Sequence, residues 1–237
     1  MTLILVLLII FAGVFTQSVA GFGSALVMMP LLTSVIGLAQ AAPLVSMLGV
    51  LTQIVLMLYF RQEMRFCHIC RLIVLALVVI AFGLWFVLCL DGDVSTAVLG
   101  FVVFGYAVYA LLNLKLPALK RPFYGYVFGF FGGLLAGAFN TPGPPYVSYG
   151  DGRQWPPSEF KGNLQPIFFV GAIVVFSGHL MSNNITPTIF GYFLRAIPIW
   201  LTALGIGLWL GNKIPAPIFR RLVLVLLVII GLRLIIA

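Results

Sequence analysis

Residues 123–149 read FYGYVFGFFGGLLAGAFNTPGPPYVSY, an apolar and glycine-rich stretch that is interrupted at residues 140–143 by Asn-Thr-Pro-Gly. Glycine, asparagine and proline together favour a turn, and proline cannot continue a helix from its interior. We therefore expect two helical segments, 123–139 and 143–149, on either side of the interruption. The stretch predicts a broken helical hairpin.

A second interrupted stretch occupies residues 2–36, with apolar segments at 2–16 and 24–36. Its break, Val-Ala-Gly-Phe-Gly-Ser at residues 19–24, aligns with Ala-Phe-Asn-Thr-Pro-Gly at 138–143 with an offset of 119 residues. The two breaks agree in their place within the chain more than in their letters. This agreement indicates an internal duplication.

The composition places both hairpins in a lipid bilayer. Of the 237 residues, 62% are hydrophobic and only 8% are charged, whereas soluble domains have about 25% charged residues. At about 20 residues per crossing, the chain has room for one membrane domain, 1–237, and for no appended soluble domain. The N-terminus has no basic region before its apolar run, so a cleaved signal peptide is not expected.

Six further apolar stretches are each about 20 residues or more, which is enough to cross roughly 30 Å of hydrocarbon. We predict one transmembrane helix in each: 40–60, 71–90, 94–113, 162–182, 187–210 and 215–236.

The basic residues orient these spans, because cytoplasmic loops are enriched in Lys and Arg. The connections near residues 37–42, 91–93 and 183–186 contain no Lys or Arg, and we place them outside. We place four other connections in the cytoplasm, and they hold Arg61, Arg65, Arg71, Lys115, Lys120, Arg121, Arg153, Lys161, Lys213, Arg220 and Arg221.

With these orientations, each hairpin begins and ends on the same side of the membrane. Residues 1–113 and 123–237 then form two repeats of opposite orientation, each a broken or re-entrant hairpin followed by three transmembrane helices. The predicted fold is all-α, polytopic and built as an inverted repeat. Inverted repeats with interrupted helices are typical of secondary transporters whose site lies near the bilayer midplane.

The same residues resemble a known family, the TauE/SafE-type sulfite exporters. The resemblance rests on residues 21–24 (Gly-Phe-Gly-Ser), 29–32 (Met-Pro-Leu-Leu), 132–137 (Gly-Gly-Leu-Leu-Ala-Gly) and 143–145 (Gly-Pro-Pro). Asn140 and Pro142 stand where the family pattern has glycine, which leaves the preferred anion open. The resemblance implies export of sulfite, a related sulfur oxyanion or an organosulfonate.

A small anion inside a membrane needs hydrogen-bond donors and positive potential in place of water. Backbone N–H groups and the dipole at an interrupted helix supply both, and glycine lets the ligand approach the main chain. We therefore predict an anion site at the breaks, where the helices would meet near the membrane centre. The alternative is that the glycines only permit close helix packing, the role that we favour for Gly129, Gly132 and Gly133. The site residues expected at the breaks are Gly21, Phe22, Gly23, Ser24, Asn140, Thr141 and Gly143.

Three polar residues inside predicted spans complete the candidate site. Arg195 lies about 12 Å along its span, and its guanidinium could bind a sulfonate or sulfite through two hydrogen bonds. It could instead reach the membrane interface. The amides of Gln53 and Gln165 could line a pathway or join helices.

The sequence argues against an enzyme and against a zinc site. All five carboxylates fall in predicted connections, so paired acid and base groups for an enzyme are absent from the spans. Residues 67–70, Cys-His-Ile-Cys, supply only half of a zinc site. We expect no cofactor, metal or nucleic acid. The predicted protein is a multi-pass transporter of the inner membrane that moves an anion by alternating access; the alternative is a passive anion channel. The sequence leaves a homodimer open.

Overall fold

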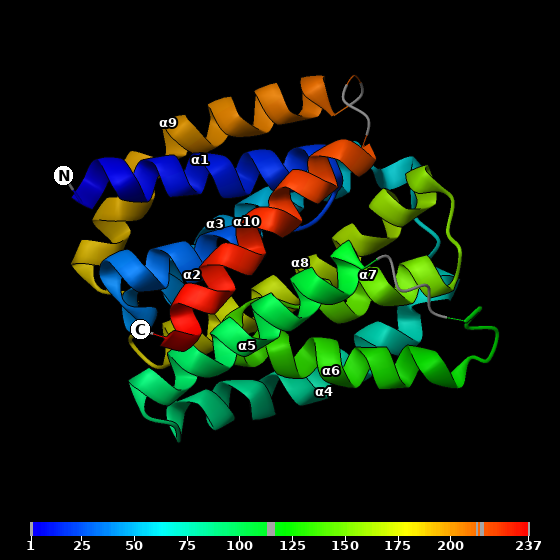
Figure 1. Cartoon of the computed structure of the whole chain (residues 1–237), viewed down its shortest axis with the longest axis horizontal. Coiled ribbons are helices and arrows are strands. Elements are labelled where there is room, and N and C mark those ends of the chain that lie inside the picture. The colour runs from blue at the N-terminus through cyan, green and yellow to red at the C-terminus, as the bar shows by residue number, and fades with distance from the viewer. Residues whose placement is uncertain (1, 113–116, 212, 214–215, 237) are drawn as a thin grey trace. The chain divides into compact units, whose positions relative to one another are not determined.

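Figure 1 shows the computed structural model, which describes residues 2–112, 117–211, 213 and 216–236. Over these residues the structure contains ten α-helices, one short 3-10 helix and no strand, which confirms the predicted all-α class. Lys115, which the sequence placed in a cytoplasmic connection, lies outside the described residues. The elements are α1 (Thr2–Ala20), α2 (Ser24–Ile36), α3 (Leu38–Tyr59), η1 (Arg61–Glu63), α4 (Phe66–Leu88), α5 (Gly92–Leu111), α6 (Phe123–Phe139), α7 (Gly143–Gly152), α8 (Pro157–Met181), α9 (Pro187–Leu210) and α10 (Ala216–Ile236).

Six helices in the described part of the chain are long and apolar enough to cross a membrane: α1, α3, α4, α5, α8 and α9. The sequence predicted α1 as a short segment that ends at residue 16, but the helix continues to Ala20. Ser18 stays inside it because its hydroxyl donates to the Val14 carbonyl at 2.8 Å. The chain is a multi-pass membrane protein.

Two helices start about one turn before their apolar stretches. The α4 helix begins at Phe66, where residue 71 was predicted, and α8 begins at Pro157, where residue 162 was predicted. The polar first turns pair with each other, since His68 Nδ1 lies 2.6 Å from Glu159 Oε1. Pro157 suits the first helical position, where its missing N–H costs nothing. Hydropathy alone misses these turns because their polar side chains do not belong to the apolar core.

The helices form two compact units, and each is described by itself. Unit 1 consists of residues 1–45, 90–114 and 183–237, and unit 2 consists of 46–89 and 115–182. The division does not follow the two predicted repeats, because α4 belongs to unit 2 and α9 to unit 1. That the halves 1–113 and 123–237 are repeats stays a prediction.

In unit 1, the first hairpin helix α1 lies beside α9, and α5 lies beside α10 (Figure 1). Small residues allow these approaches. A Cβ added to Gly207 of α9 would lie 2.5 Å from Ser18 Cβ of α1, and one added to Gly100 of α5 would lie 2.9 Å from the Gly231 carbonyl oxygen of α10. Both helix pairs therefore approach too closely for a side chain at either glycine.

In unit 2, α6 lies along α4 in the same direction (Figure 1). Along the contact, Gly129 faces Leu72, Gly133 faces Ala76 and Gly137 faces Ile80, so that each glycine meets the α4 backbone one turn further along. Gly132 faces the ring of Tyr146 on α7. The packing role that the sequence predicted for Gly129, Gly132 and Gly133 is confirmed.

Both interrupted stretches fold back as hairpins. In unit 2, the Leu119 N–H donates to the Gly152 carbonyl at 2.9 Å, so the hairpin of α6 and α7 begins and ends at the same place, as predicted. In unit 1, a Cβ on Gly13 of α1 would lie 2.9 Å from the Ser24 carbonyl oxygen of α2. The first stretch therefore folds back with α2 in close contact with α1.

The breaks of the two hairpins correspond in position and backbone conformation. Ala20 and Phe139 end the first helices, and Ser24 and Gly143 begin the second ones, an offset of 119 residues in both cases. The first residue of each break is left-handed, with φ of 84° at Gly21 and 56° at Asn140. This agreement supports the predicted duplication, and the opposite orientation of the halves stays a prediction.

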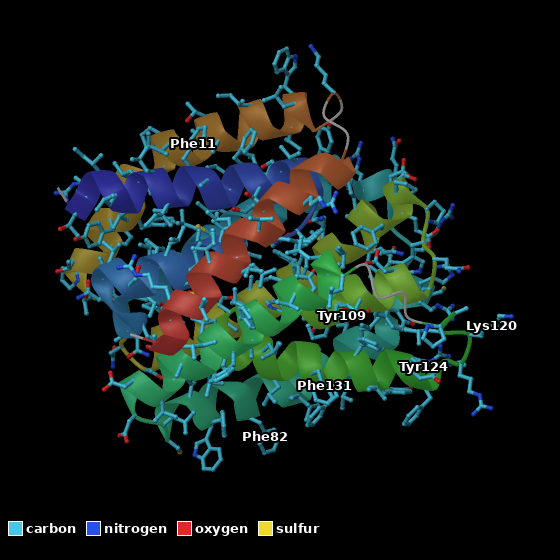
Figure 2. All side chains as sticks on the ribbon, viewed as in Figure 1. Phe11, Phe82, Tyr109, Lys120, Tyr124 and Phe131 are labelled. Carbon is cyan, nitrogen blue, oxygen red and sulfur yellow. The ribbon has the colours of Figure 1, made fainter. Side chains whose placement is uncertain are left out.

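Large apolar side chains also cover outer surfaces within each unit. In unit 2, Phe82 of α4 and Phe131 of α6 project outward (Figure 2), and they are 62% and 53% exposed. In unit 1, Leu201 of α9 is 55% exposed. A soluble monomer rarely exposes so many large apolar groups, so these surfaces fit contact with lipid.

The packing of α4 on α6 gives a stability prediction. A Cβ on Gly137 would overlap the Ile80 carbonyl oxygen and lie 2.8 Å from Leu84 N, and neither backbone atom can move aside. We expect Gly137→Ala to lower the free energy of unfolding by about 1–3 kcal/mol, as overpacking does. Thermal unfolding of the purified protein in detergent measures the change.

Gly105 of α5 provides the matched control, because a Cβ there would meet nothing within 4 Å. Gly105→Ala should leave the unfolding temperature unchanged or raise it, since alanine favours a helix by up to about 1 kcal/mol over glycine. Equal unfolding temperatures for the two variants would contradict the close contact.

Candidate functional site

The first break, residues 21–23 between α1 and α2, is a buried turn in unit 1. Gly21 and Gly23 have φ of 84° and 104°, a region that favours glycine. The Gly21 N–H donates to the Gln17 carbonyl at 2.7 Å and closes α1. The predicted site residues of this break, Gly21, Phe22, Gly23 and Ser24, are all buried.

Gln17 joins the two helices at this break. Its side-chain Oε1 accepts a hydrogen bond from the Ser24 N–H at 3.0 Å, which caps the first turn of α2. Its Nε2 is buried and has no hydrogen-bond partner. Gln17 is not among the site residues predicted from the sequence, although an amide one turn before a break in an apolar helix was a usable signal.

A small pocket opens beside the first break within unit 1. It is bounded by Thr16 and Gly23 of the hairpin, Tyr106 of α5, and Leu224 and Leu227 of α10. Almost all of its surface is apolar. The pocket is therefore poorly suited to a charged ligand, and the polar groups at this break are Gln17 and the backbone of α2.

The second break, residues 140–142 in unit 2, presents side-chain donors. The Asn140 N–H donates to the Ala136 carbonyl at 2.9 Å and the Thr141 N–H to the Leu135 carbonyl at 3.1 Å, so the backbone of the turn is satisfied. Asn140 Nδ2 and Thr141 Oγ1 are buried without a hydrogen-bond partner, and Thr141 is 0% exposed. Two side chains that can donate therefore meet at the break.

The helix N-terminus at this break is weaker as a donor than the sequence analysis expected. Gly143 begins α7 and keeps its N–H, but Pro142, Pro144 and Pro145 around it have none. The first turns of α2 and α7 therefore differ. Anion binding at the second break would depend on Asn140, Thr141 and the Gly143 N–H.

Neither break lies at the middle of the helix that packs beside it. A Cβ on Gly211, which directly follows α9, would lie 3.2 Å from Val19 Cα, so the first break is level with the end of α9. A Cβ on Gly83, past the middle of α4, would lie 2.9 Å from Ala138 N, just before the second break.

The helices that precede the two breaks are nearly as long as a bilayer is thick. The 19 residues of α1 and the 17 of α6 rise about 28 Å and 25 Å, close to the roughly 30 Å of a hydrocarbon core. The midplane position of the breaks stays a prediction.

The remaining predicted site residues occupy different settings. Gln53 of α3 is 4% exposed, and its Oε1 has no partner. Gln165 of α8 is fully buried and donates from Nε2 to the Lys161 carbonyl of its own helix at 2.8 Å. Both belong to unit 2 with the second break. Arg195 of α9 is exposed, whereas the neighbouring Ala196 is 0% exposed, so its side chain points away from the core of unit 1.

A polar network at one end of unit 2 has a structural role. Buried Asn163 of α8 accepts from the Arg65 N–H at 2.6 Å and donates to Glu159 Oε1 at 3.2 Å, and Glu159 in turn contacts His68. Cys67 and Cys70 beside it are exposed free thiols. In the described part of the chain, no group of three or more His, Cys, Asp or Glu residues could hold a metal ion.

Comparison with protein families gives one match, to the family described as sulfite exporter TauE/SafE, over residues 5–234. Comparisons with curated proteins and with solved structures give no match. The match includes both hairpins and both breaks, and it confirms the resemblance drawn from residues 21–32 and 132–145. The chain belongs to the sulfite exporter TauE/SafE family of membrane transporters.

Proposed function

We propose that this protein exports a small sulfur-containing anion, such as sulfite or an organosulfonate, across the inner membrane of the cell. Family membership gives the class of cargo. The observation that carries the proposal is the pair of unpaired donors, Asn140 Nδ2 and Thr141 Oγ1, buried at a helix break.

Buried donors without partners suit an anion that has lost its water. An unmatched polar group in a protein interior is costly, and the cost is removed when a ligand supplies the missing partner. None of the five carboxylate side chains is buried. Glu63, Asp91, Asp93 and Asp151 are exposed, and Glu159 lies in the first turn of α8. The electrostatic setting therefore favours an anion over a cation.

Export of one negative charge needs no further energy source when the cell interior is negative. Each 100 mV of membrane potential favours its expulsion by about 2.3 kcal/mol. A carrier and a passive channel would both use this gradient. Three buried donors without a partner, Gln17 Nε2, Asn140 Nδ2 and Thr141 Oγ1, lie at or beside the breaks, and discrete groups of this kind favour the carrier.

For the carrier we propose alternating access in which units 1 and 2 are the moving bodies. In each unit, a hairpin packs closely on a helix from the other half of the chain, α1 on α9 and α6 on α4. Backbone contact through glycine makes each pair rigid, because packed interfaces deform little. If the two sequence halves moved as rigid bodies instead, the helices of each pair would have to separate.

Purified protein in proteoliposomes should take up radiolabelled sulfite with saturation, and unlabelled sulfite on the opposite side should accelerate the exchange. A flux that rises linearly with concentration and shows no counterflow would favour the channel. Sulfite, sulfate and methanesulfonate, compared by thermal shift, rank the anions, because a bound ligand stabilises the folded state.

Thr141→Val tests the second break separately from the fold. The substitution removes a buried hydroxyl that has no partner, so the unfolding temperature should stay the same or rise. Sulfite affinity should fall by about fivefold to tenfold, the value of one hydrogen bond of about 1–1.5 kcal/mol. Thermal shift and counterflow measure both quantities.

Thr33→Val is the matched control, because Thr33 Oγ1 is also buried without a partner but lies near the far end of α2, nine residues after Ser24 at the first break. It should leave sulfite affinity unchanged. Wild-type affinity in Thr141→Val would remove the hydroxyl from the site.

Cross-linking tests which bodies move. Gly49→Cys on α3 and Ala172→Cys on α8 would place two Cβ atoms about 3.8 Å apart, the usual separation in a disulfide. The pair joins the two sequence halves within unit 2. We expect oxidised protein, with Cys67, Cys70 and Cys89 replaced by Ser, to keep its counterflow rate.

The control pair is Ala136→Cys with Gly171→Cys, at about 3.9 Å, which lies within one half and one unit. It should be tolerated whichever bodies move. Loss of counterflow in the Gly49 and Ala172 pair alone, restored by a reductant, would show that the halves move and the units do not.

A further inference from the structure

Gln17 is a buried polar side chain next to the first break. It lies on α1, one turn before Gly21, and is 2% exposed. Its Oε1 accepts from the Ser24 N–H at 3.0 Å. Because that partner is a donor, the oxygen and nitrogen of the amide are assigned by the hydrogen bond itself.

This bond leaves the Gln17 amino group at the N-terminus of α2 with no partner. The group offers two N–H donors. The 13-residue helix α2 adds the positive end of its dipole and first-turn N–H groups that no helical carbonyl can reach. The Gln17 side chain thus supplies an acceptor to α2, while its own N–H donors have no partner.

We propose that Gln17 is a ligand of the transported anion: its Nε2 donates a hydrogen bond to an oxyanion seated at the N-terminus of α2. The inference rests on the proposed function and names the group that recognises the cargo at the first break. The ligand class is a small oxyanion with several acceptor oxygens, one of which meets Nε2 while another meets the α2 backbone.

The proposal gives the two breaks a common chemistry. The first break presents the carboxamide of Gln17 and the second that of Asn140, and in each the amino group is buried and has no hydrogen-bond partner. The two residues do not occupy equivalent positions in the 119-residue offset, since Asn140 aligns with Gly21. A sequence alignment of the halves therefore does not reveal this similarity. It consists in the position of an unpartnered amino group at each break.

Gln17→Glu separates the capping role from the ligand role. The carboxylate keeps an oxygen for the Ser24 N–H and replaces the amino group with a second oxygen, which repels an anion. The probe is sulfite at pH 8.5, measured by thermal shift and by counterflow in proteoliposomes. We expect at least a tenfold loss of sulfite affinity, with the unfolding temperature of the sulfite-free protein close to that of the wild type.

A neutral variant keeps the test decisive if a buried carboxylate prevents folding. Gln17→Met has a similar length and removes both the acceptor and the donors, so it should lower the unfolding temperature and weaken sulfite binding together. Gln40→Glu, with the same charge change at an exposed residue of α3, should bind sulfite like the wild type.

Either folded Gln17 variant with wild-type sulfite affinity would overturn the proposal and leave Gln17 as a helix cap only. A wild-type protein that responds to no sulfite, sulfate or methanesulfonate would instead overturn the proposed function, and this inference with it. The two failures are distinguished by the behaviour of the wild type alone.

Discussion

The rest of this structure depends on the need to satisfy backbone hydrogen bonds where water is absent. A continuous helix meets that need by itself, but a helix that stops inside the membrane leaves N–H and C=O groups exposed. The chain resolves the problem locally at its two breaks. Gln17 binds the Ser24 N–H at the first break, and at the second the N–H groups of Asn140 and Thr141 bond back to α6. The groups that remain unpaired at the breaks are side-chain donors: Gln17 Nε2, Asn140 Nδ2 and Thr141 Oγ1.

Close packing against a long helix stabilises each broken hairpin. Gly137 meets Ile80 on α4, and Gly207 meets Ser18 on α1, so each hairpin lies directly against a long helix. Lipid offers helices no hydrophobic reason to associate, and van der Waals contact between small residues takes over that role. Both contacts join a hairpin to a helix from the other half of the chain. The units that result cut across the predicted sequence repeats.

Much of this arrangement could be predicted from the sequence because its signals are local. The boundaries 24–36, 123–139 and 187–210 agree with the observed helices, since glycine and proline end each apolar run sharply. The starts of α4 and α8 were missed because the contact between His68 and Glu159 joins residues far apart in the chain. Gln17 was missed for the same reason, as its importance comes from where Ser24 folds back.

The sequence by itself determined the membrane environment, the all-α class, the two breaks and the family, because composition and local helix breakers act within a few residues of the chain. Only the tertiary structure decided how far along its neighbour each break lies, which helix each hairpin packs against and which donors stay unpaired. These properties depend on contacts such as Gly211 with Val19 and Gly133 with Ala76. Such contacts join residues that are separated by most of the chain or by several helices, and no local pattern records them.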